Sequence, residues 1–157
     1  MVRSHEHFME LALEEARKGE SEGNVPVGSV IVRGDEVVAS GRNLVNSTHD
    51  VTAHAETVAL RNCTQALKKV DLSGYTLYTT MEPCPMCCGA IMYSRISALV
   101  LGARLKDTDP SPTCGPYAVE KLLELAQWGP RLRLVTGVLQ KQCEEIRLRW
   151  LNKQSHR

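Results

Sequence analysis

The chain has 157 residues, of which 43% are hydrophobic, and its formal net charge at pH 7 is +1. A chain of this length and composition can build one hydrophobic core and is too short for two ordinary domains, so we predict a single domain over residues 1–157. The near-neutral charge excludes a general electrostatic attraction to nucleic acid, although a local basic patch can exist within a balanced total.

The hydrophobic segments are too short for a membrane span or a secretion signal. The longest, residues 96–103, is far below the roughly 20 residues that cross a bilayer, and the first residues lack the apolar core of a signal peptide. We therefore expect a cytoplasmic protein without a membrane partner. The six cysteines are not expected to form a disulfide framework, which is typical of small secreted domains with poor cores.

The first predicted elements are a helix and a hairpin. Apolar residues recur at helical spacing over residues 4–18, with a capping serine at the start and a glycine after the end. Two β-branched runs, at residues 27–32 and 36–40, flank the turn-forming segment 33–35. The first two strands are therefore expected to be antiparallel.

Helices and strands alternate in the rest of the chain. Helices are predicted at residues 54–66, from Pro85 onward, at 116–128 and at 139–151, and strands at 75–80, 97–103 and 131–136. This order favours an α/β fold, a three-layer α/β/α sandwich around a five-stranded mixed sheet. A helix separates the last two strands, so these are expected to be parallel with a right-handed crossover.

Two short motifs carry residues with catalytic potential. His54-Ala55-Glu56 precedes the cluster Pro83-Cys84-Pro85-Met86-Cys87. Cysteines three apart at the start of a helix place both sulfurs on one face, where they can bind one metal ion. One imidazole and two thiolates fill three of the four tetrahedral positions of Zn²⁺ and leave one for water, which indicates a catalytic zinc site.

The motifs follow an H-x-E and P-C-x-x-C pattern, and on them the chain resembles the zinc-dependent cytidine/deoxycytidylate deaminase superfamily. The similarity extends to residues 41–43, 49–56 and 76–84, which are most similar to the branch holding bacterial tRNA adenosine deaminases, bacterial guanine deaminases and fungal cytosine deaminases. The resemblance implies a cytidine-deaminase-like fold, a bound Zn²⁺ ion and hydrolytic deamination of a cyclic amidine.

The resemblance also implies a role for each residue of the motifs. His54, Cys84 and Cys87 would be the zinc ligands, and Glu56 the proton shuttle. Glu56 would take a proton from the metal-activated water, deliver it to the ring nitrogen and later protonate the leaving ammonia. Cys88 is expected to pack in the core, because it diverges from Cys87 by about 100° on a helix.

Two further residues are implied as contacts to the base. Asn43 stands where this branch holds an asparagine against the base, and an amide offers both a donor and an acceptor to a ring edge. Taken without the resemblance, an asparagine after Gly-Arg also fits a simple turn residue. The backbone N–H of Ala55 corresponds to the family's donor to the product carbonyl.

The segment at residues 104–116 is expected to shape the substrate pocket, because it follows a strand whose carboxyl end borders the site. It lacks the Lys-Thr-Gly-Ala-like run of tRNA adenosine deaminases, and the tail lacks the late acidic residue of the cytosine and guanine deaminases. Asp107 and Asp109 are candidates to replace that acidic residue at the substrate, although a loop carboxylate is more commonly solvated.

Three functions stay open on the sequence. The favoured one is a zinc hydrolase that deaminates a free nucleobase or nucleoside with a cytosine-like or guanine-like ring. The first alternative is a tRNA adenosine deaminase that produces inosine in an anticodon loop, with steep salt dependence. The second is a structural zinc or redox protein built on the C-x-x-C unit, which would leave His54 and Glu56 unexplained.

The carboxyl-terminal segment bears on macromolecular partners. Basic residues gather there, and a solvated helix face is favoured over a polyanion site. The predicted last helix has one apolar stripe, and Tyr93 and Trp150 are candidate exposed aromatics, so a homodimer is expected, as is common in the family. The basic residues are Arg131, Arg133, Lys141, Arg147, Arg149, Lys153 and Arg157. The stripe comprises Leu139, Cys143, Ile146 and Trp150.

Overall fold

A five-stranded mixed sheet forms the centre of the computed structural model, which describes residues 2–110 and 113–157. The strand order is β2-β1-β3-β4-β5. β1 pairs antiparallel with β2 and β3, whereas β3, β4 and β5 are parallel to one another. The mixed sheet and the parallel pairing of its last two strands are therefore confirmed. The strands are β1 (Gly28–Arg33), β2 (Glu36–Arg42), β3 (Thr76–Met81), β4 (Ala98–Ala103) and β5 (Arg133–Val135).

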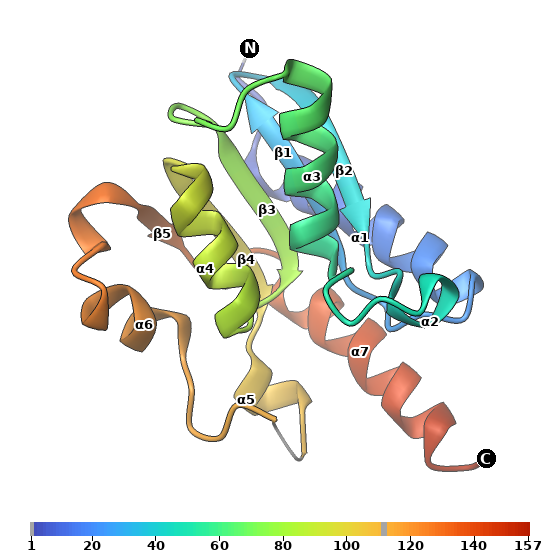
Figure 1. The fold of residues 1–157 in the computed structure, drawn as a ribbon. Coiled ribbons are helices and arrows are strands. Elements are labelled where there is room, and N and C mark those ends of the chain that lie inside the picture. Colours follow the sequence, from blue (N-terminus) through green and yellow to red (C-terminus); the bar gives the residue numbers. More distant parts are fainter. Residues whose placement is uncertain (1, 111–112) are drawn as a thin grey trace.

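Helices cover both faces of this sheet (Figure 1). One apolar cluster joins the sheet to α1 and α7, and a second joins its other face to α3, α4 and α6. The three-layer α/β/α sandwich is thus confirmed. The helices are α1 (His5–Ser21), α2 (Val45–Thr48), α3 (Ala55–Leu67), α4 (Pro85–Ser94), α5 (Leu105–Thr108), α6 (Val119–Leu125) and α7 (Gln140–Gln154), with a 3₁₀ turn η1 (Gly129–Arg131).

The side chains of β1 fill both layers. Ile31 packs with the cluster under α3 and α4, whereas Val30 and Val32 pack with the cluster of α1 and α7. Successive side chains of a strand point to opposite faces, so a continuous apolar run is required where both faces are covered. Cys88 lies in the cluster with α3 and α4 and is fully buried, in agreement with its predicted place in the core.

The last third of the chain differs in detail from the prediction. The helix predicted over residues 116–128 is limited to α6, because Gln127 adopts a left-handed φ of 54° and Pro130 then directs the chain into η1. β5 is shorter than the predicted strand 131–136. The helices α2 and α5 were not predicted, because four residues are too few to show a helical repeat of apolar positions.

Two helices begin at the same end of the sheet. The chain passes from the carboxyl end of β3 directly into α4, and α3 packs beside α4 with its own first turn at that end (Figure 1). All six cysteines are free thiols. Within the described ranges, no helix has the length and apolarity needed to cross a membrane.

Candidate active site

The first turns of α3 and α4 bring the two sequence motifs together. His54 is the residue before α3 and Cys84 is the residue before α4, and both have extended backbone. Pro85 occupies the first turn of α4, where a proline fits because the backbone N–H there has no partner inside the helix. The imidazole and the two sulfurs therefore converge from two adjacent helices.

The distances between these groups fit a tetrahedral zinc site. His54 Nδ1 lies 3.6 Å from Cys84 Sγ and 3.5 Å from Cys87 Sγ, and the three ligand atoms lie within 4.8 Å of one another. Metal–sulfur bonds of about 2.3 Å and metal–nitrogen bonds of about 2.0–2.1 Å at the tetrahedral angle predict an N···S separation of about 3.6 Å. The donor set and its spacing thus suit Zn²⁺, with His54 binding through Nδ1.

The two thiols have opposite proton affinities. The hydrogen bond with Cys87, followed by that with His54, lowers the pKa of the Cys84 thiol to about 4 despite its burial. The hydrogen bond with Cys84 and burial raise the pKa of Cys87. The pair therefore holds one proton at neutral pH, and metal binding to both sulfurs would release it.

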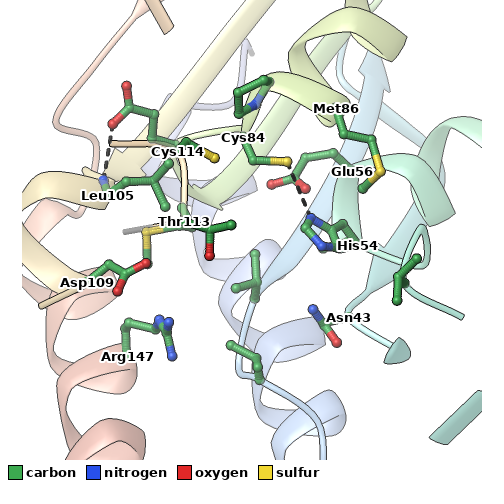
Figure 2. A pocket seen from close by; sticks show the side chains of 17 residues that line it. Asn43, His54, Glu56, Cys84, Met86, Leu105, Asp109, Thr113, Cys114 and Arg147 are labelled. Carbon is green, nitrogen blue, oxygen red and sulfur yellow. Dashed lines mark hydrogen bonds between the residues drawn. The ribbon is translucent and has the colours of Figure 1, made fainter. Parts of the chain in front are cut away.

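Glu56 is a buried carboxyl group beside the metal ligands (Figure 2). Only 3% of its surface is exposed, and its Oε1 accepts a hydrogen bond of 2.8 Å from the hydroxyl of Thr79 on β3. Burial raises the pKa of Glu56, against the opposing effect of the Thr79 hydrogen bond. A raised pKa makes it easier for the carboxyl group to take up a proton.

Asn43 and Ala55 both line the cavity in front of these groups. The Asn43 Oδ1 accepts a hydrogen bond of 3.1 Å from the Val45 N–H, so the residue has the turn geometry considered above. The same bond fixes the amide, and Figure 2 shows its nitrogen on the side that faces His54. Ala55 is the first residue of α3, where backbone N–H groups have no partner inside the helix.

The two candidate aspartates lie in different places. Asp109 follows α5 and lines the cavity, whereas Asp107 is exposed on α5 and borders a separate surface hollow with Leu148 and Asn152. The structure therefore brings Asp109 but not Asp107 to the site. Asp109 also borders that hollow, so it lies between the hollow and the cavity, because it follows the end of α5 with extended backbone.

The cavity has a volume of about 500 Å³ and includes several residues that were not predicted from the sequence. Arg147 of α7 is the most consequential of these, because it adds a cation to a largely apolar wall. Its signal in the sequence is its position four residues after Cys143 and three before Trp150, on the apolar stripe of the helix. The other unpredicted residues are Val25, Val27, Val51, Met81, Glu82, Pro85 and Met86, whereas Leu105, Thr113 and Cys114 come from the segment 104–116 that was expected to shape the pocket.

Glu82 organises the segments around the cavity. Its buried carboxylate accepts hydrogen bonds from the backbone N–H groups of Leu105 at 3.1 Å and Val119 at 2.8 Å, and from Arg104 at 3.2 Å. These bonds attach the starts of α5 and α6 to the end of β3. The connection between them, which contributes Asp109 and Cys114 to the cavity, is therefore anchored at both ends.

Comparison with known proteins agrees with this geometry. Residues 2–103 match the family model described as the cytidine and deoxycytidylate deaminase zinc-binding region. The chain belongs to this family. It is therefore a zinc-binding deaminase, a hydrolase of C–N bonds, as its sequence motifs predicted.

Several relatives resemble the chain over most of its length. It is 38% identical to the tRNA-specific adenosine deaminase of Bacillus subtilis, over 88% of this chain and 83% of that protein. It is 46% identical to the enzyme of that name from Buchnera aphidicola subsp. Baizongia pistaciae, over 93% of this chain and 87% of that protein.

Solved structures show the same fold. One, from a study of A-to-I editing by tRNA:A34 deaminases, is 37% identical and has a TM-score of 0.76 over 89% of this chain and 98% of that one. The guanine deaminase of Nitrosomonas europaea is 27% identical and has a TM-score of 0.85 over 98% of this chain and 87% of that one.

The sequence-based preference for a free nucleobase or nucleoside as the substrate is wrong. Relatives with 38–46% identity over most of the chain are named tRNA-specific adenosine deaminases, which favours the alternative that the sequence left open. The substrate prediction relied on one segment, residues 104–116, whose sequence departs from the pattern of those enzymes. Such connections vary more among relatives than the elements they join.

Proposed function

We propose that the protein is a tRNA adenosine deaminase that converts adenosine to inosine in an anticodon loop. The observation that carries this proposal is the similarity, at 38–46% identity over most of the chain, to enzymes named tRNA-specific adenosine deaminase. Adenosine deamination replaces the C6 amino group by a carbonyl and releases ammonia. The proposal also places the activity where tRNA is found, which we take to be the cytoplasm.

The metal site would consist of His54, Cys84 and Cys87. Their N···S distances of 3.5 and 3.6 Å support this assignment, as does the low pKa of Cys84. When bound, zinc lowers the pKa of a coordinated water toward neutrality. Three protein ligands would leave one of the four positions of a bound zinc ion for water, and this suits a catalytic rather than a structural site.

Glu56 would carry the protons of the reaction. It would accept a proton from the attacking water and donate it to the N1 atom of adenine, and then take the second proton from the new C6 hydroxyl and deliver it to the amino group as the C–N bond breaks. Burial supports the uptake step because it raises the pKa of the carboxyl group, which makes it easier to protonate. The Thr79 hydroxyl would hold Oε1 in position throughout.

Asn43 and Ala55 would orient the adenine ring before attack. The fixed amide of Asn43 can contact the ring edge, and the N–H of Ala55 can donate to the oxygen that forms at C6. Asp109, the residue after α5, would face the sugar or the base. A nucleotide reaches such a pocket only when it is unstacked, which single-stranded loops allow at low cost.

The protein would also bind RNA outside the cavity and form a homodimer. Lys153 near the exposed end of α7 and Arg157 just after it would contact phosphates. Tyr93 on α4 is 92% exposed and Met86 is 39% exposed. An exposed apolar surface of this kind suits contact with a second copy of the chain.

A substrate panel tests the proposal directly. Zinc-loaded protein would be incubated with an anticodon stem-loop containing adenosine at the wobble position, and separately with adenosine, adenine, guanine and cytosine. We expect inosine from the stem-loop, with a rate that falls steeply as salt increases, and no ammonia from the free bases. Turnover of a free base with an inert stem-loop would contradict the proposal.

A further inference from the structure

Arg147 lies in the catalytic cavity without a role in the chemistry described above. It extends from the middle of α7 below Asp109, on the side of the cavity away from His54 and Cys84 (Figure 2). Its neighbours on the helix, Cys143 and Ile146, are buried in the core. The position therefore belongs to the inner face of α7 and not to its solvated face.

The Arg147 guanidinium has unused hydrogen-bonding capacity. Its Nη1 is buried and has no hydrogen-bond partner within residues 2–110 and 113–157. Burial lowers the pKa of the guanidinium, while the charge of Asp109 raises it. Because a buried polar group without a partner is unfavourable, an acceptor that arrives at this nitrogen would be bound with a gain in free energy.

Trp150 fixes the orientation of that guanidinium. The Arg147 Cζ lies over the indole ring, 4.9 Å from the ring centroid. Stacking on an aromatic ring occupies the flat face of a guanidinium and leaves the N–H groups at its edge for in-plane acceptors. Two adjacent N–H groups of this kind match the oxygens of a phosphate group.

We propose that Arg147 is a specificity-determining residue that binds a phosphate group of the nucleotide whose base is deaminated. The proposal rests on the proposed function and names the group that this part of the cavity recognises. The metal ligands and Asn43 lie where the base would be held, and Arg147 lies across the cavity from His54. Apart from His54 and the thiols, the described residues that line the cavity have four ionisable side chains, and three of them, Glu56, Glu82 and Asp109, are acidic. Arg147 therefore supplies the positive charge that a phosphate requires.

A binding cycle with modified RNA tests this assignment. All proteins would carry Glu56→Gln, so that the stem-loop binds without turnover, and dissociation constants would be measured for Arg147, Arg147→Leu and Arg147→Lys forms. The RNA would be used unmodified, or with one uncharged methylphosphonate on the 5′ or the 3′ side of the target adenosine. Arg149→Leu, on the exposed face of the same helix, is the matched control.

We expect Arg147→Leu to weaken binding of unmodified RNA by about ten- to hundredfold, the effect of losing one charged hydrogen-bonding partner. One of the two methylphosphonates should weaken binding to the Arg147 form by a similar factor and have almost no further effect on the Leu form. Arg147→Lys should fall between them, because it keeps the charge and loses the paired donors. Arg149→Leu should show no coupling to either modification.

Additive effects of Arg147→Leu and each methylphosphonate would overturn the assignment. If Arg147→Leu weakened binding only by disturbing α7, the effects of Arg147→Lys and the methylphosphonates would be additive as well. Adenosine 5′-monophosphate and adenosine separate the two possible sources of the phosphate. An Arg147-dependent preference for the monophosphate, with no binding of the stem-loop, would support the phosphate contact and contradict the tRNA function. Equal binding of both small molecules, together with additive effects in RNA, would contradict the phosphate contact. In that case, inosine formation in the stem-loop would still support the tRNA function.

Discussion

The Glu56 side chain is held in position by residues far from it in the sequence. Its backbone comes from the first turn of α3, but its Oε1 is held by Thr79 on β3. The carboxyl group is enclosed, so its position depends on the Thr79 hydroxyl, on the neighbouring Cys87 thiol and on the packing around it. A proton shuttle must keep the same geometry while it takes up and gives back a proton.

We predict that Thr79→Val lowers kcat by about ten- to hundredfold, because a hydrogen bond to a charged group contributes about 1.5–3 kcal/mol and about 1.4 kcal/mol corresponds to tenfold in rate. Valine has nearly the same shape, so the zinc content should not change. Steady-state kinetics on the stem-loop with measured zinc content checks this. Thr79→Ser should recover most of the rate, and a Val variant with unchanged kcat would show that the hydroxyl is dispensable.

The sequence predicted the proposed metal ligands and proton shuttle but not the residues that support them. His54, Glu56, Cys84 and Cys87 belong to two short motifs that resemble the deaminase pattern, so their roles could be predicted without a fold. Thr79 and Arg147 act through contacts between elements that are distant in the chain. Such contacts depend on the register of the sheet and the packing of α7, which no local pattern specifies.

At the scale of elements, α3 must approach the sheet closely to place its first turn. Gly41 of β2 faces that helix, and a Cβ atom there would lie 2.5 Å from the carbonyl oxygen of Ala55 and closer still to the backbone nitrogen of Ala59. Both neighbours are backbone atoms, which cannot move aside without moving the helix. A glycine is therefore required at this crossing.

We predict that Gly41→Ala destabilises the protein by about 1–3 kcal/mol, the usual effect of overpacking. Activity should also fall, because a shift of the Ala55 backbone would displace the adjacent Glu56. Urea unfolding of the zinc-loaded protein measures the change. Gly89→Ala in α4 is the control, because its added Cβ meets nothing within 4 Å and alanine favours a helix over glycine by about 0.5–1 kcal/mol. Equal effects of the two substitutions would refute the close approach of β2 and α3.

The start of α6 is tied to the end of β4 by an ion pair. Glu120 accepts hydrogen bonds of 2.6 and 2.8 Å from Arg104, which also contacts the buried Glu82. The pairing with Arg104 lowers the pKa of Glu120 below its ordinary value of 4.5. A carboxylate with a lowered pKa in the folded protein stabilises the fold above its ordinary pKa, and this contribution disappears as the pH falls through the lowered value.

We predict that Glu120→Gln reduces stability at neutral pH and that the difference from the unsubstituted protein disappears below pH 4.5, as Glu120 becomes protonated. The effect at neutral pH should be small because the carboxylate is half exposed. Denaturant midpoints measured over a series of pH values check this. A difference that stays constant from neutral to acidic pH would mean that the charge of Glu120 is unimportant.

In the whole molecule, the catalytic cavity draws on all three layers. The starts of α3 and α4 on one face supply His54, Glu56 and Cys84, the end of β3 supplies Met81 and Glu82, and α7 on the other face supplies Arg147. The layered fold could be predicted because helices and strands alternate clearly along the chain. The lengths of α6 and β5 could not, because a left-handed residue and a Gly-Pro turn interrupt the apolar pattern there.

The central claim is that this assembly is a zinc-dependent site that deaminates adenosine in RNA through Glu56. The most direct test measures inosine formation in the anticodon stem-loop by the unsubstituted protein and by Glu56→Gln at equal zinc content. We predict inosine with the unsubstituted protein and a loss of at least about a hundredfold in rate with the variant, the usual contribution of general acid–base catalysis. Inosine formation at an unchanged rate in Glu56→Gln, with zinc still bound, would contradict the account.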